Sequence, residues 1–119
     1  MNTPWGPAQT VKQIAAGCWW ITTAGHGGMK LDVKLYPMPA AVLARPFVHR
    51  VKVMDGAGTT VYLLLEEDCE WAWAIEQHPG LAVPMAPLFG LTPERVRADA
   101  ARMVAWMNER AGVAPTVPS

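Results

Sequence analysis

The sequence has few charged residues, few cysteines and no long apolar segment free of helix-breaking residues. Only 17% of its 119 residues are charged, with ten basic and ten acidic side chains, while 51% are hydrophobic. The low charge and the apolar bias argue against a disordered tail, and the balanced total argues against a general electrostatic nucleic-acid binder. A chain of this length buries about two-thirds of its surface on folding, so a hydrophobic core alone can stabilise it. We therefore expect one compact domain over residues 1–119.

The two cysteines, Cys18 and Cys69, lie far apart in the sequence. No secretory signal is expected, because no basic residue precedes Lys12 and no continuous apolar stretch follows the start. We therefore predict reduced thiols in a cytoplasmic protein. The longest uncharged runs, 13–29 and 77–93, are interrupted by glycine or proline, so no membrane span is predicted.

Patterns typical of metal sites are also missing. The sequence has neither a CxxC pair nor an HExxH helix, and its three histidines, His26, His49 and His78, are widely spaced. We therefore expect no metal site and no cofactor.

Strand patterns dominate the first half of the chain. Alternating and β-branched residues predict strands at 10–14, 18–23, 29–33, 48–54 and 60–65, with Gly-rich turns at 25–28 and 55–58 that complete two hairpins. Val51 and Val53 would face inward, and the last strand would be buried on both sides. Prolines bracket a short helix over 40–44, and residues 1–9 are interpreted as an N-terminal arm laid against the domain.

The middle of the second half mixes helical signals with prolines. Acidic residues that would complement the helix dipole predict a helix from Glu66 to about Gln77. The apolar segment Leu81–Gly90 carries two prolines, so we expect it to be irregular and to cover the core or to meet a partner, such as a second copy of the chain.

A long helix over 93–111 is predicted near the end of the chain, because apolar residues recur at helical spacing and form one stripe along it: Val96, Ala100, Met103, Val104 and Met107. Thr92 is a suitable N-cap and Gly112 a suitable stop, and we expect residues 113–119 to form a frayed tail. Strands that precede helices predict an α+β fold, in which antiparallel hairpins form a small sheet packed against two or three helices.

The most unusual stretch is the Gly-rich motif Thr22–Gly28, which carries His26 between glycines. Glycines allow positive φ, which can turn backbone N–H groups toward an anion while His26 acts as a donor, acceptor or base. The alternative is a tight hairpin loop with a structural role. A phosphate-binding loop is disfavoured, because a strand rather than a helix follows the glycines.

A second motif, Leu65–Trp71, surrounds Cys69 with four carboxylates. A helix dipole would lower the pKa of this thiol, whereas the carboxylates would raise it. We therefore interpret Cys69 as a structural thiol, with a nucleophile as the alternative. His26 could form a dyad with Glu67 or Asp68 if the fold brings the two motifs together.

The balanced charge hides an asymmetry. Residues 1–60 hold six bases and two acids, whereas residues 61–119 hold four bases and eight acids. Five of those acids fall within 66–76, which predicts either a solvated helix terminus paired with bases or an acidic surface that attracts a basic partner. The six tryptophans are expected mainly in the core, with an interface role as the alternative.

Together the two motifs resemble those of a small domain of unknown function found in phage, plasmid and bacterial proteins. Its pattern pairs S/T-x-x-H-G-G with E-E-D-C-D/E-W, and this chain matches it at Thr23–Gly28 and Glu66–Ala72. The resemblance covers about residues 17–80. The resemblance implies an accessory protein of a mobile genetic element, which would lie in the host cytoplasm if a phage encodes it. No reaction is established for the family.

We therefore expect a non-enzymatic binding protein of phage or mobile-element origin that acts on a host or element protein in DNA processing or defence. Its partner would be a protein rather than nucleic acid or a membrane. The chain could also form a homodimer. Both motifs would supply binding residues: Thr23, His26, Gly27, Gly28, Glu66, Glu67, Asp68 and Trp71.

The alternative is a small enzyme. In that interpretation His26 works with Asp68 or Glu67 as an acid or base, and Cys69 is a candidate nucleophile.

Overall fold

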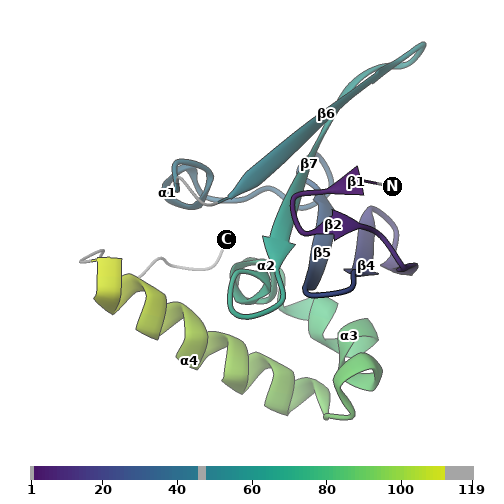
Figure 1. Ribbon diagram of the computed structural model, residues 1–119. Helices are drawn as coiled ribbons and strands as arrows, with labels where there is room; N and C mark the ends of the chain where they lie inside the picture. Colours follow the sequence, from purple (N-terminus) through teal and green to yellow (C-terminus); the bar gives the residue numbers. More distant parts are fainter. Residues whose placement is uncertain (1, 46–47, 112–119) are drawn as a thin grey trace. The chain divides into compact units, whose positions relative to one another are not determined.

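The computed structural model describes residues 2–45 and 48–111. They fall into two compact units, one within residues 1–68 and one within residues 69–119, which are described one after the other. The first holds all the described strands and one short helix, and the second is helical (Figure 1). The predicted α+β fold is therefore confirmed, while a single domain over 1–119 stays a prediction. The predicted stop at Gly112 and the tail 113–119 lie outside the described residues.

The first unit is built on a five-stranded antiparallel sheet in the order β3-β4-β5-β7-β6. Its strands are β3 (Thr10–Ala15), β4 (Cys18–Thr22), β5 (Gly27–Asp32), β6 (His49–Asp55) and β7 (Gly58–Glu66). Both predicted hairpins are confirmed, because β4 pairs with β5 and β6 pairs with β7. The second hairpin joins the sheet through β7, which pairs with β5, so β6 becomes the edge strand.

Burial differs sharply between the two strands of this second hairpin. The prediction for β7 is confirmed at Leu63–Leu65, where each side chain is at most 2% exposed. The prediction for β6 is wrong, since Val51 and Val53 are 39% and 40% exposed. An edge strand has one neighbour only, and the far end of this hairpin projects beyond the other strands of the sheet (Figure 1).

The N-terminal arm forms a small ribbon of its own. Strands β1 (Asn2–Thr3) and β2 (Gly6–Pro7) pair antiparallel, and the ring of Trp5 between them lies against Gly28 of the sheet. Later in this unit, the short helix α1 (Ala40–Leu43) confirms the helix predicted between the prolines.

The second unit consists of helices. They are α2 (Trp71–Gln77), the 3₁₀ turn η1 (Pro79–Leu81), α3 (Ala82–Phe89) and α4 (Pro93–Ala111). Helices α2 and α3 both contact α4. The buried side chains Val96, Ala100 and Val104 form the predicted apolar stripe of α4, and the N–H of Arg95 donates to the Thr92 hydroxyl at 3.2 Å, which confirms the N-cap.

Two expectations for this part of the chain are wrong. Helix α2 begins at Trp71 rather than Glu66, because Glu66 ends β7 and the next residues form turns. The segment Leu81–Gly90 is largely helical rather than irregular: Pro84 lies in the first turn of α3, where a missing N–H costs little, and Gly90 ends the helix with φ of 64°. None of the described helices is long and apolar enough to cross a membrane.

Candidate functional site

The pairing of β5 with β7 joins the two sequence motifs at one end of the sheet. In the antiparallel register, Gly28 lies opposite Glu66, and the N–H of Glu67 donates to the Gly27 carbonyl at 2.9 Å. Side chains alternate between the two faces of a strand, so continuing this register sets His26 opposite Asp68, on the same face as Glu66. Strand register thus explains how residues forty positions apart in the sequence come together.

The two glycines of the motif are needed for space rather than for a turn. Gly27 and Gly28 are buried residues of β5, and neither has positive φ, so the predicted turn of positive-φ glycines is wrong here. A Cβ on Gly28 would lie 2.1 Å from the carbonyl oxygen of Leu65 and 2.7 Å from the Trp5 ring. Only glycine therefore lets the Trp5 ring pack beside the ladder that carries the site.

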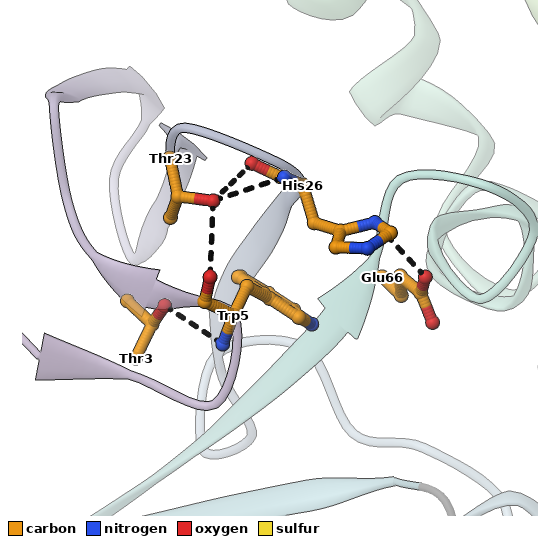
Figure 2. A network of polar contacts seen from close by, with 5 residues as sticks. All are labelled: Thr3, Trp5, Thr23, His26 and Glu66. Atoms are coloured by element: carbon orange, nitrogen blue, oxygen red, sulfur yellow. Dashed lines mark hydrogen bonds and ion pairs between the residues drawn. The ribbon is translucent and has the colours of Figure 1, made fainter.

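Thr23 holds the loop that presents His26. Its hydroxyl accepts the N–H of His26 at 3.0 Å and lies 2.5 Å and 3.2 Å from the carbonyl oxygens of His26 and Trp5. The backbone N–H of Thr23 also donates to the His26 carbonyl at 2.7 Å. Figure 2 shows this hydroxyl between Trp5 and His26, and the His26 ring turned away from it toward Glu66. Thr23 is therefore a positioning residue for His26.

The site itself consists of His26, Glu66 and Asp68, and we call it the His26 cluster. One imidazole nitrogen and one oxygen from each carboxylate lie within 4.8 Å of one another. The Nδ1 atom of His26 is 3.7 Å from Oε1 of Glu66, and these side chains are 56% and 34% exposed (Figure 2). The cluster is thus open to solvent, and its backbone is held by the β5–β7 ladder and by Thr23.

Burial and neighbouring charges both shift the pKa of the Glu66 carboxyl. Partial burial raises the pKa of its carboxyl, and the nearby Asp68 and Glu67 raise this pKa further, while His26 acts in the opposite direction. The carboxylates therefore repel one another, and a positive charge placed among them would relieve that repulsion.

The other predicted site residues do not belong to this cluster. Glu67 pairs with Gly27 on the opposite face of the strand, and its carboxylate lies beside that glycine. Cys69 and Trp71 belong to the second unit, where Trp71 is buried and its ring lies 5.3 Å from that of Phe89. Cys69 precedes α2, so it does not occupy the first helical turn in which a dipole would activate its thiol.

Sequence reasoning missed two features of the site. It paired His26 with Glu67 or Asp68, but the ion pair described is with Glu66, which lies diagonally across the ladder. It also left out Trp5, whose carbonyl lies beside the Thr23 hydroxyl and whose ring covers Gly28. Successive side chains of a strand point to opposite faces. If Glu66 had been assigned to a strand, this alternation would have predicted Glu66 and Asp68 on one face and Glu67 on the other.

The arrangement suits binding of a cation more directly than catalysis. Two carboxylates and an imidazole can contact an ammonium or guanidinium group, or a metal ion. His26 and Glu66 could also exchange protons with a substrate, but both are open to water, which weakens the electrostatic stabilisation on which catalysis depends.

Comparisons with known proteins give a family without an assigned activity. No curated protein and no solved structure matches the chain. A protein-family model does match, over residues 1–109, which include both motifs and every residue of the His26 cluster. The chain therefore belongs to the family described as Domain of unknown function (DUF7007).

Proposed function

We propose that the protein is a small accessory binding protein that recognises a positively charged segment of a protein partner at the His26 cluster. The observation that carries the proposal is the convergence of His26, Glu66 and Asp68 at an exposed end of the sheet. Two of the three groups are acids on one strand face, and a lysine or arginine side chain would relieve the repulsion between them.

The construction of the site favours binding over turnover. Its backbone is fixed by the β5–β7 ladder and by Thr23, so a partner meets a preorganised surface. The resemblance to small phage and plasmid domains favours a mobile-element origin and a partner in DNA processing or defence. Proteins that handle nucleic acid carry basic surfaces, which match the charge of this site.

The experiment measures the affinity of a fluorescent peptide of alternating Arg and Gly for the protein, by fluorescence anisotropy in the presence of EDTA. We expect the E66Q/D68N variant to bind it at least about tenfold more weakly, because each charge-assisted hydrogen bond contributes about 1.5–3 kcal/mol. A matched control is D55N at the exposed end of the β6–β7 hairpin, which also removes an acidic charge while keeping an acceptor for the Ala57 N–H. The proposal would be contradicted if the wild-type protein did not bind the peptide, or if both variants lost the same affinity for it.

A second candidate function is acid–base catalysis by His26 with Glu66. The 3.7 Å approach of Nδ1 to Oε1 favours it, because a carboxylate can orient an imidazole and stabilise its protonated form. This dyad differs from the one expected from the sequence, since Glu66 takes the place of Asp68 or Glu67. Turnover lost in both H26N and E66Q, but kept in D68N, would favour catalysis over binding.

A further inference from the structure

We propose that the His26 cluster is a binding site for a divalent transition-metal ion of the zinc type, with His26, Glu66 and Asp68 as its protein ligands. This metal-site proposal goes beyond the recognition of a basic partner, because it expects the protein to bind a metal ion without any partner present. Neither proposal depends on the other.

The distances already approach those of a coordination site. Zinc bonds of about 2.0–2.2 Å in a tetrahedral arrangement set neighbouring ligand atoms about 3.3–3.6 Å apart. The Nδ1 atom of His26 and Oε1 of Glu66 are 3.7 Å apart, and the donor atoms of all three residues lie within 4.8 Å of one another. Rotations about side-chain bonds of these three residues would close the difference.

The sheet supplies the rigidity that a metal site requires. Glu66 and Asp68 are separated by one residue on β7 and the turn after it, so their side chains share a face, and the register sets His26 across from them. The Thr23 hydroxyl fixes the loop at the backbone of His26, and Gly28 leaves room beside the ladder for the Trp5 ring. Ligands on neighbouring strands with a supported backbone are characteristic of preorganised metal sites.

The donor set selects the kind of ion. An imidazole nitrogen favours zinc, copper, iron or nickel, whereas calcium and magnesium prefer ligands made entirely of oxygen. Two carboxylates balance the charge of a divalent ion, and three protein ligands leave a fourth position for water or for a group from a partner. This set of ligands could not be recognised in the sequence, because its three residues are not spaced as in a known metal-binding motif.

The test is calorimetric titration of zinc into the untagged full-length protein, in a phosphine reductant that keeps both cysteines reduced. We expect one zinc ion per chain, with calcium and magnesium binding at least about 100-fold more weakly. H26N and D68N should each weaken zinc binding by at least about 100-fold, since loss of even an indirect supporting group costs 10–100-fold. Circular dichroism would show that these variants of exposed side chains remain folded.

Two control variants decide which residues bind the ion. H49N removes an exposed histidine of the same unit, and C69S removes a thiol that could bind zinc, so both should keep the wild-type affinity within about twofold. Cobalt bound to the wild type should show no thiolate charge-transfer band. Absence of zinc binding, a cobalt–thiolate spectrum, or equal loss in H49N or C69S would overturn the proposal. Because peptide binding is measured in EDTA, either proposal can fail without the other.

Discussion

The two ends of strand β7 behave differently although they belong to one continuous strand. At its C-terminal end, Leu63–Leu65 are buried, Leu63 and Leu64 pair with both β5 and β6, and Glu66 pairs with β5 and enters the His26 cluster. At its other end, Gly58 and Thr59 are exposed and pair with β6 alone. A strand in the middle of a sheet gains packing and fixed geometry that the same strand lacks in a projecting hairpin, so the functional groups lie at the supported end.

The largest expected difference concerns apolar packing. Leu65→Ala should lower the free energy of unfolding by about 2–5 kcal/mol, because it leaves a cavity at a fully buried position. Val53→Ala, which shortens an apolar side chain of the projecting hairpin, should change it by about 0.5 kcal/mol or less. Urea denaturation followed by tryptophan fluorescence measures both. Losses of similar size would show that the hairpin packs as firmly as the centre of the sheet.

A smaller difference concerns glycine. Gly28→Ala should cost about 3 kcal/mol, because its Cβ would collide with the backbone of Leu65 and with the Trp5 ring. Gly56→Ala in the turn of the β6–β7 hairpin meets no atom within 4 Å and should cost about 0.5 kcal/mol or less. The same denaturation measurement applies. A mild effect of Gly28→Ala would mean that β5 and Trp5 can move apart, and the site would then be less rigid than described.

The smallest difference concerns a hydroxyl group. Thr23→Val keeps the shape of the side chain but removes the contacts to the His26 backbone, and should cost about 1–2 kcal/mol. Thr59→Val at the exposed end of β7 should change stability by about 0.5 kcal/mol or less. Thermal unfolding measured by circular dichroism compares the two. Equal midpoint temperatures of unfolding for the two variants would show that water replaces the Thr23 hydroxyl without loss of stability.

Much of the local structure could be predicted from the sequence. Alternating residues and turn glycines identified both hairpins, and the 3.6-residue period with a threonine cap identified α4. The start of α2 was predicted wrongly from the acidic run at 66–68, because carboxylates are compatible with both the first turn of a helix and the end of a strand. Burial of β6 was mispredicted for a related reason: alternation identifies a strand but not its place in the sheet.

The candidate site was predictable only in outline. The two motifs could be recognised as unusual, and the sequence singled out His26, Glu66 and Asp68 among its binding residues. Their convergence required the pairing of β5 with β7, which are separated by α1 and β6. Long-range pairing of this kind depends on the competition among all the strands, and no local pattern encodes it.

The sequence by itself determined a chain with little charge and few cysteines that forms strands first and helices afterwards. Periodicity and turn chemistry act over a few residues, so they are legible without a structure. Only the tertiary structure decided that Gly27 and Gly28 make room within the sheet rather than turn the chain, and that Glu66 and Asp68 share a face with His26 while Glu67 does not. Register and close approach are relations between segments, and they exist only once the strands have paired.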